Sequence, residues 1–186
     1  MARPRTSTLL LALVAVLVVA AGAFAAWLSF GQTSPAAGAF EEARIVRVVD
    51  GDTLVVNVGG KDEKLRLIGI DAPESVSADA AANVPEGELA SAYLEDLVKP
   101  GQTVYLQKDT SDTDKYGRLL RYVWLEQPHD PITLDDVRTK MVNGILVADG
   151  FAQAKRYKPD VAYAEQLERL QSEAVSQRNG VSYLWS

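Results

Sequence analysis

Cysteine is absent from this sequence of 186 residues, and histidine occurs once, at His129. Without cysteine the chain has no disulfide, no zinc site built on thiolates and no thiol nucleophile. With one histidine it has neither a histidine metal cluster nor a pair of histidines for acid and base catalysis. Any bound metal must therefore be held by oxygen ligands, which favours Ca²⁺ or Mg²⁺. We expect carboxylates and arginines to carry the chemistry, and His129 to lie on the surface.

Positive charge is also scarce, because 19 Lys and Arg stand against 25 Asp and Glu, for a formal net charge of −6. Every acidic residue follows residue 40, so the segment after it is more acidic than the whole chain. Proteins that bind nucleic acid usually present a basic face, and we therefore expect weak, salt-sensitive affinity for polymeric nucleic acid. A local cluster of cations could still form one attractive site on this acidic body. The candidates for that cluster are Arg66, Lys115, Arg118, Lys155, Arg156 and Lys158.

One long uncharged apolar run extends from Leu9 to Leu28, and two arginines precede it. Twenty residues, at about 1.5 Å each, would cross a hydrocarbon core of roughly 30 Å. Small residues within 21–25 would also suit cleavage of a signal peptide. We predict a transmembrane anchor or signal segment over 1–30 and a linker over 31–39, and the length of the run favours the anchor. In either case the leading positive charges place the following domain outside the cytoplasm, anchored or secreted.

Residues 40–186 are predicted to form one α+β domain. Short β-branched runs separated by turn signals predict five strands, and a helical pattern lies between the third and fourth. The predicted strands span residues 44–49, 53–58, 64–70, 103–108 and 119–125. The three predicted helices span 85–98, a stretch within 137–148, and a last segment that begins near Pro159 and ends at Asn179. This order favours a five-stranded barrel of the oligonucleotide/oligosaccharide-binding (OB) type, with Leu184 and Trp185 packed back against it.

Two short acidic motifs carry the candidate chemistry. The first, Asp-Gly-Asp-Thr at 50–53, is on its own common material for a tight turn that binds nothing. The second, Asp-Ala-Pro-Glu at 71–74, follows a strand that presents Arg66 on the face opposite its leucines. In a twisted barrel the start of the second strand and the end of the third can lie side by side, which would bring Asp52 and Asp71 together. Two adjacent carboxylates repel unless a cation joins them, so the joint pattern predicts a cation site.

Four segments, 50–53, 65–74, 114–118 and 184–186, resemble in order and spacing the staphylococcal (thermostable, micrococcal) nuclease family, with its TNase-like domain. They read Asp-Gly-Asp-Thr, Leu-Arg-Leu-Ile-Gly-Ile-Asp-Ala-Pro-Glu, Asp-Lys-Tyr-Gly-Arg and Leu-Trp-Ser. The resemblance covers nearly all of 44–186. It implies an OB-type barrel and a Ca²⁺-dependent phosphodiesterase that hydrolyses DNA and RNA with little sequence preference.

The resemblance also implies a role for each matched residue. The implied roles are Ca²⁺ binding by Asp52, Asp71 and the main-chain carbonyl of Ala72, activation of water by Glu74, and binding of the scissile phosphate by Arg66 and Arg118. Many family members have threonine at the position of Ala72, but a main-chain ligand needs no particular side chain. Arginine suits a phosphate because its planar guanidinium donates two parallel hydrogen bonds, where lysine offers a point charge.

Three further residues are candidates for substrate binding. Lys115 and Tyr116 precede Arg118, and the resemblance implies that they contact a neighbouring phosphate. Tyr157 would stack on a nucleobase, although packing in the core is an equal alternative for this residue. Lys155 stands where family members often have a second tyrosine, so we expect a weaker or altered preference for nucleotides.

Three acidic residues just before that segment, Asp109, Asp112 and Asp114, lack the spacing of an EF-hand calcium loop. We expect them to be solvated.

Two other functions are compatible with the same fold. One is a non-catalytic OB-type module that binds single-stranded nucleic acid or a protein at the membrane surface, and the other is an extracytoplasmic adaptor that binds proteins. Degenerate modules normally lose arginines or acidic ligands, whereas this chain keeps the full set. We therefore favour a nuclease that acts as a monomer on DNA and RNA, with single strands preferred, and that contacts the membrane through its amino-terminal helix.

Overall fold

A computed structural model of the chain describes residues 40–75 and 84–186, all of which belong to the unit Pro35–Ser186. The predicted anchor or signal segment over 1–30 and the linker over 31–39 lie outside the described residues. Among the residues that are described, no helix is long and apolar enough to cross a membrane.

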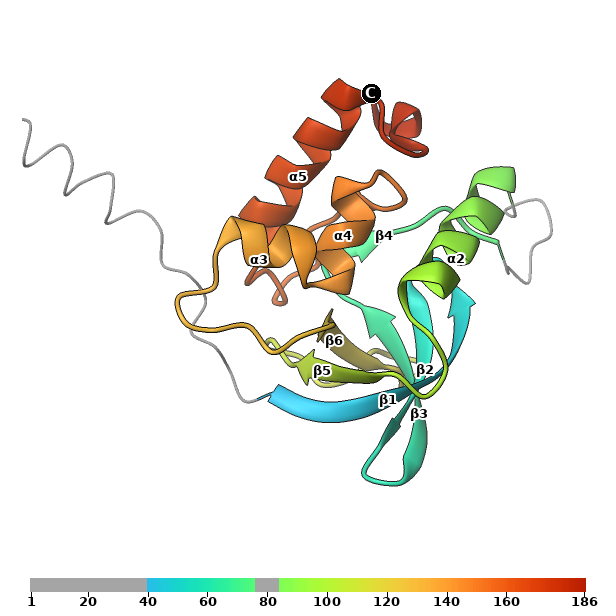
Figure 1. Ribbon diagram of the computed structural model, residues 1–186, viewed down its shortest axis with the longest axis vertical. Helices are drawn as coiled ribbons and strands as arrows, with labels where there is room; N and C mark the ends of the chain where they lie inside the picture. Colours follow the sequence, from blue (N-terminus) through green and yellow to red (C-terminus); the bar gives the residue numbers. More distant parts are fainter. Residues whose placement is uncertain (1–39, 76–83) are drawn as a thin grey trace, which may run out of the picture. The chain divides into compact units, whose positions relative to one another are not determined.

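Five strands close into a barrel in the order β1-β2-β3-β6-β5 (Figure 1). Their bounds are Phe40–Asp50 (β1), Thr53–Val58 (β2), Lys61–Leu67 (β3), Thr103–Gln107 (β5) and Leu119–Trp124 (β6). Neighbouring strands are antiparallel except β3 and β6, which run parallel. Gly59 and Gly60 both have positive φ, which lets the chain turn tightly from β2 into β3. The predicted five-stranded barrel is confirmed.

The barrel interior is filled by alternate residues of its strands, as the two-residue period of a strand requires. Leu54 and Val56 of β2 and Leu65 and Leu67 of β3 are fully buried. Arg66 lies between the two buried leucines of β3 and its side chain is 15% exposed. The pleat therefore directs Arg66 away from the interior, as the sequence predicted.

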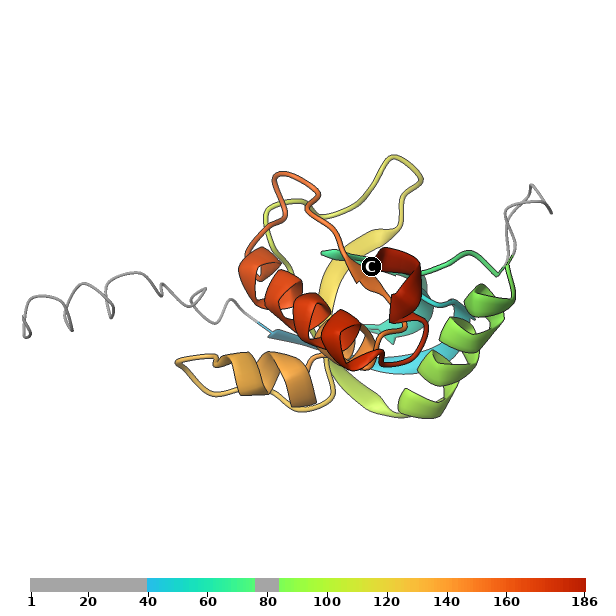
Figure 2. The same ribbon diagram turned by 90° about the horizontal axis from the view of Figure 1, so that it is seen from above.

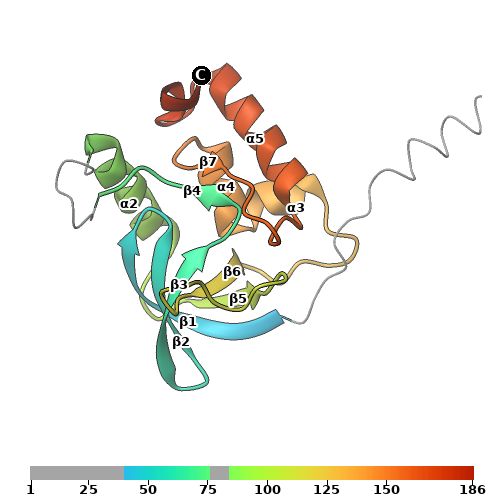
Figure 3. The same cartoon turned by 180° about the vertical axis from the view of Figure 1, so that it is seen from behind.

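The third strand has the predicted length of seven residues, but it begins and ends earlier in the chain, at Lys61 and Leu67. It ends at Leu67, and a turn at Gly69, where φ is 79°, leads into the two-residue strand β4, Ile70–Asp71. This strand pairs with β7, Gln153–Ala154, in a separate two-stranded sheet (Figure 3). The prediction of one strand over 64–70 was wrong because the chain leaves the barrel at this turn. As a result the carboxylate of Asp71 is placed by β7 and not by a barrel strand.

Within residues 40–75 and 84–186 there are four α-helices and one short 3₁₀ helix, where three helices were predicted. Their bounds are Pro85–Leu97 (α2), Leu134–Thr139 (α3), Val142–Ala148 (α4), Ala164–Gln177 (α5) and Ser182–Trp185 (η2). Helix α2 packs beside β1, whereas α3, α4 and α5 gather at another part of the barrel (Figures 1 and 2).

The single helix predicted within 137–148 is broken in two at Met141. That residue has extended backbone angles and pairs with Trp124 at the end of β6, so the helix cannot continue through it. The last helix begins at Ala164 and not near Pro159, because the preceding residues form a loop. The carboxy-terminal prediction was also wrong in part, since Val181 and Ser182 are buried while Leu184 is exposed.

Candidate active site

Arg66 joins the two predicted acidic residues. One guanidinium nitrogen pairs with Oδ2 of Asp52, and the other donates to Oδ1 of Asp71 at 2.8 Å. Asp52 is buried and also accepts a hydrogen bond from the Thr53 hydroxyl at 3.0 Å. The structure thus brings together three of the predicted site residues, Asp52, Arg66 and Asp71, in one fork-shaped arrangement.

The β1–β2 hairpin explains why Asp52 reaches this position. Asp50 pairs with Thr53 across the turn, and Thr53 in turn pairs with Arg66 on β3. The main-chain oxygen of Asp52 accepts a hydrogen bond from the Leu67 amide at 2.9 Å, which fixes the hairpin tip beside the end of β3. The expected neighbourhood of the start of β2 and the end of β3 is therefore observed.

Ala72 closes the group from the other side. Its amide donates to Oδ2 of Asp52 at 3.1 Å, and its side chain is buried against the hairpin tip. A Cβ on Gly51 would lie 2.9 Å from the Cβ of Ala72, so glycine allows the two segments to approach this closely. The main chain of Ala72 consequently lies beside the Asp52 carboxylate, within the predicted metal-binding set.

Glu74 is exposed and lies beside a hydrogen-bonded cluster that the sequence did not reveal. Asp50, which is buried, accepts hydrogen bonds at Oδ1 from the Ser75 hydroxyl at 2.6 Å and the Ser91 hydroxyl at 3.1 Å. Ser91 belongs to α2, so this cluster ties the segment that carries Glu74 to that helix. In the sequence, only the Asp50-Gly51 turn signal pointed to this cluster, and that signal gave no indication of Ser75 or Ser91.

The pKa values of Glu74 and Asp50 are shifted in opposite directions. Although Glu74 reaches the surface, partial burial raises the pKa of its carboxyl; the negative charge of Asp50 and a hydrogen bond shared with Asp50 raise this pKa further, and the positive charge of Arg66 lowers it. Burial alone would raise the pKa of Asp50, but hydrogen bonds from Ser75, the Gly51 amide and Ser91 outweigh it and lower that pKa. Glu74 is therefore the stronger base of the two carboxylates.

Arg118 ends the loop between β5 and β6. Its Nε donates to Oδ2 of Asp114 at 2.7 Å, and its guanidinium lies 5.6 Å from the centre of the Tyr116 ring. The parallel pairing of β3 with β6 places Leu120 beside Arg66, two residues after Arg118 in the chain. Within the described residues the side chain of Arg118 contacts Asp114 and Tyr116, and no direct contact joins it to Asp52, Arg66 or Asp71.

The two loops that carry the substrate-binding candidates lie side by side. Tyr116 is 72% exposed, and the ammonium of Lys115 lies 4.9 Å from the centre of its ring. Tyr157 is 42% exposed, with the ammonium of Lys155 at 5.7 Å from its ring centre. The alternative that Tyr157 packs in the core is therefore wrong. Both rings keep a surface on which another planar group could stack.

Asp160 connects these loops and was missed in the sequence. It is buried, and its Oδ1 accepts the amides of Thr110 and Ser111 at 3.0 and 2.7 Å. Asp109 adds a second connection, since its Oδ2 accepts the Ala162 amide at 2.9 Å. No local pattern marks Asp160, because its partners lie some fifty positions away along the chain.

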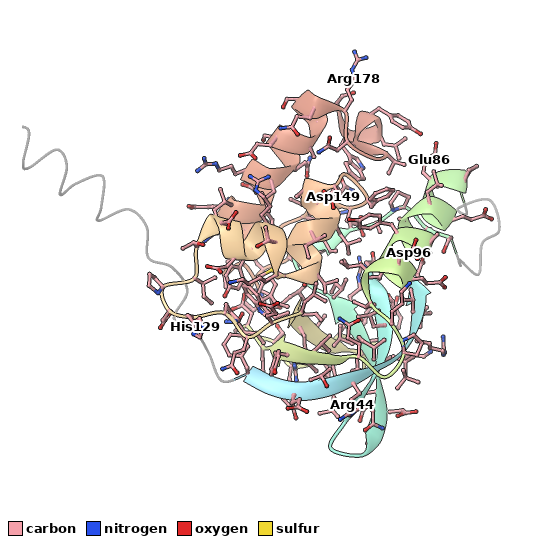
Figure 4. The ribbon with its side chains drawn as sticks, viewed as in Figure 1. Arg44, Glu86, Asp96, His129, Asp149 and Arg178 are labelled. Carbon is pink, nitrogen blue, oxygen red and sulfur yellow. The ribbon has the colours of Figure 1, made fainter. Side chains whose placement is uncertain are left out.

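The expectation that Asp109, Asp112 and Asp114 are solvated holds for Asp112, whose side chain is 60% exposed, but was wrong for Asp109 and Asp114, which are partly buried. Asp109 makes the contact with the Ala162 amide, Asp112 pairs with Arg121 at 2.8 Å, and Asp114 accepts the amides of Tyr116 and Arg118 at 2.8 and 3.0 Å. These carboxylates shape the loop through internal bonds. His129, by contrast, is exposed on the loop after β6, as expected (Figure 4).

The donor atoms at the site are oxygens. Within the described part of the chain, no group of three or more His, Cys, Asp or Glu side chains is arranged to hold a metal ion. The carboxylates of Asp52 and Asp71 and the main chain of Ala72 form a smaller set, of the chemical kind that hard cations prefer. Arg66 and Lys155 already bond to these carboxylates; Lys155 was expected only as a member of a cation cluster, and its ion pair with Asp71 was not predicted.

Comparisons with known proteins agree with this geometry. The family model described as "Staphylococcal nuclease homologue" matches residues 64–186. A thermonuclease of Staphylococcus hyicus is 35% identical over 143 residues, which cover 77% of this chain and 75% of the relative. A thermonuclease of Staphylococcus intermedius is 37% identical over 134 residues, with 72% and 71% covered, and the endonuclease YncB of Bacillus subtilis is 33% identical over 142 residues, with 75% and 59% covered. The chain belongs to the staphylococcal nuclease family.

Proposed function

We propose that this chain is a Ca²⁺-dependent nuclease that hydrolyses phosphodiester bonds of DNA and RNA with little sequence preference. The observation that carries the proposal is the Asp52–Arg66–Asp71 group, with Glu74 exposed at its side. The names of the relatives, two thermonucleases and an endonuclease, point to the same chemistry.

Asp52, Asp71 and the main-chain carbonyl of Ala72 are the residues proposed to hold Ca²⁺. They fit the ion because all are oxygen donors and two of them are carboxylates that lie on either side of one guanidinium. When bound, the cation would offset negative charge on the phosphate oxygens.

Arg66 and Arg118 are proposed to bind the phosphate at which the bond is cleaved. Attack by water adds negative charge to the phosphate oxygens, and a guanidinium donates two hydrogen bonds in matching geometry. Arg118 is 29% exposed and paired with a single carboxylate, so it can exchange that partner for a phosphate. Arg66 is held more rigidly by Asp52 and Asp71, which fixes the orientation in which its guanidinium would meet the phosphate.

Glu74 is proposed to accept the proton of the attacking water. Its carboxylate is exposed and therefore accessible to water, and its raised pKa makes it a better proton acceptor than an ordinary glutamate. Asp50 supports this role, because its hydrogen bonds with Ser75 and with Ser91 of α2 hold the segment 74–75 against that helix.

Lys115, Tyr116 and Tyr157 are proposed to contact the substrate beyond the scissile bond. Stacking on exposed rings requires unpaired bases, so single strands are the expected preference. The prediction that residues 1–30 anchor or export residues 40–186, which act as a monomer outside the cytoplasm, remains part of this proposal.

The test is an assay of the full chain on single-stranded DNA, with Ca²⁺ and then with a chelator. Glu74→Gln is expected to lower kcat by about 100-fold or more, the usual contribution of a general base. Arg118→Ala should cause a loss of similar size, because it removes charge stabilisation of the transition state. The matched control is Glu88→Gln, which changes an exposed glutamate of α2.

Wild-type rates in both site variants would contradict the proposed mechanism. DNA that is bound but not cleaved by any form of the protein would identify a binding module in place of a nuclease. Cleavage that continues unchanged in the chelator would contradict the need for a divalent cation.

A further inference from the structure

All four carboxylate oxygens of the acidic pair have partners within the protein. Asp52 bonds to Arg66, Ala72 and Thr53. Oδ1 of Asp71 accepts a hydrogen bond from Arg66, whereas its Oδ2 accepts the Lys155 ammonium at 2.8 Å and the side-chain amide of Gln153 at 3.4 Å. A divalent cation would need some of these same oxygens.

Lys155 is held at this position by the fold. Asp71 pairs with Gln153 across the β4–β7 ladder, and the amide of Lys155 donates to the main-chain oxygen of Gly69 at 2.9 Å. Because side chains alternate along a strand, Gln153 and Lys155 lie on the same side, next to Asp71. The ion pair between Lys155 and Asp71 is therefore a consequence of register and not a chance surface contact.

Of the two cations bound to Asp71, Lys155 is the one that can move. The Arg66 side chain is 15% exposed and bridges both carboxylates. The Lys155 side chain is 46% exposed and bears its charge on a flexible stem that ends within 5.7 Å of the Tyr157 ring centre. The neighbouring ring of Tyr157 belongs to the loop proposed to bind substrate.

We propose that Lys155 competes with the divalent cation for Asp71 and moves to a substrate phosphate when the cation binds. This inference rests on the proposed function and adds to it a coupling between the binding of the divalent cation and the binding of nucleic acid. The cation repels the lysine ammonium, and a nearby phosphate offers it a new partner. Cation and nucleic acid therefore favour each other's binding, and by linkage the effect is equal in both directions.

The first experiment measures the dissociation constant of Ca²⁺ for the full chain by calorimetry, without nucleic acid. Lys155→Met is expected to bind Ca²⁺ roughly three- to tenfold more tightly than the wild type, the size expected when one partly exposed ion pair and one like charge are removed. Lys155→Gln should also bind Ca²⁺ more tightly than the wild type, and Lys155→Arg should have a dissociation constant near that of the wild type. Lys158→Met is the matched control, because it removes the same charge from an exposed position three residues away.

The second experiment measures the coupling in proteins that also carry Glu74→Gln, so that the substrate is not consumed. A short single-stranded oligonucleotide should tighten Ca²⁺ binding more in the protein with Lys155 than in the one with Lys155→Met. A structural role alone would change the melting temperature of the Lys155 variants without this difference in coupling.

Each outcome decides the inference. Equal or weaker Ca²⁺ binding by both Lys155→Met and Lys155→Gln, with wild-type binding intact, overturns it and leaves the proposed function standing. A change of the same size in Lys158→Met also overturns it, because the effect is then one of overall charge. If the wild type binds Ca²⁺ and Asp71→Asn binds it equally well, or if no form binds it, the cation site of the proposed function fails and the inference fails with it.

Discussion

Replacement of Asn143 should destabilise the domain more than any surface change, because this side chain connects three elements. It is fully buried at the second residue of α4. Its Oδ1 accepts the Val123 amide of β6 at 2.9 Å, and its Nδ2 donates to the main-chain oxygen of Ile68 at 2.8 Å. Ile68 lies in the turn that leads from Arg66 to Asp71, so Asn143 also supports the geometry of the candidate site.

The magnitude follows from the groups left without a partner. Asn143→Ala leaves one buried amide and one buried carbonyl unpaired, at about 1–3 kcal/mol each, so the free energy of unfolding should fall by about 4 kcal/mol. For a domain of this size, that corresponds to a decrease in Tm of roughly 8–16 °C. Asn57→Ala is the control, since Asn57 bonds to Asp62 in an exposed pair, and its change should stay within about 0.5 kcal/mol.

Asn143→Asp separates hydrogen bonding from packing, because it changes the volume little. Its carboxylate can still accept the Val123 amide but cannot donate to Ile68, and burial should raise its folded pKa. The folded state then binds the proton more tightly than the unfolded state, so the loss of stability should be largest at pH 7 and shrink as the pH falls. Urea denaturation at pH 7 and pH 5 measures this. An Asn143→Ala variant that loses less than about 1 kcal/mol, or an Asn143→Asp variant without pH dependence, would refute the reasoning.

Three other predictions concern packing, pH and substrate binding. Gly144→Ala would place a Cβ 1.9 Å from the main-chain oxygen of Val137, so the helices α3 and α4 must separate, and we expect a loss of about 3 kcal/mol in thermal or urea denaturation. Hydrogen bonds from Lys140 and the Thr133 hydroxyl lower the pKa of Asp136 to about 2 from 3.8. The Asp136 side chain is 17% exposed and that of Lys140 is 34% exposed, so solvent weakens the pair and its contribution should be about 1 kcal/mol. Because the folded pKa is the lower one, the stability difference between wild type and Asp136→Asn should be present at pH 6 and decline as the pH falls from about 4 toward 2; a difference that grows on acidification would contradict this. Tyr157→Ala should raise KM for a single-stranded oligonucleotide by roughly fivefold or more with little effect on kcat, since stacking is worth about 1–3 kcal/mol per base, and an unchanged KM would show that the ring does not contact substrate.

The barrel could be predicted from the sequence because its signals are local. β-branched runs and the Gly59-Gly60 turn give the strands, and the alternation around Arg66 gives its direction. The breaks in regular structure could not be predicted in this way. Met141 leaves the helix because it pairs with Trp124, a partner that sequence periodicity does not reveal.

The same distinction applies to the candidate site. The approach of Asp52 to Arg66 follows from a hairpin and the strand after it, which are close in sequence, whereas Asp71 is placed by its pairing with Gln153 of β7. The partners that complete the site come from far along the chain. Lys155 reaches Asp71 across 84 positions through the β4–β7 ladder, and Asp160 joins the two substrate loops across about fifty. Such contacts depend on tertiary register, for which one sequence carries no direct signal.

The local charge of the site also reconciles an acidic chain with a polyanionic substrate. Asp52 and Asp71 are balanced by Arg66 and Lys155, and Arg118 is balanced by Asp114, so these six charges cancel. On a chain with a formal net charge of −6, a balanced cluster of this kind exerts little attraction on phosphate. A bound Ca²⁺ would add two positive charges at the acidic pair and release Lys155 toward the substrate loop. Attraction to nucleic acid would then exist only where the cation is present, and it would be confined to the place where the bond is cleaved.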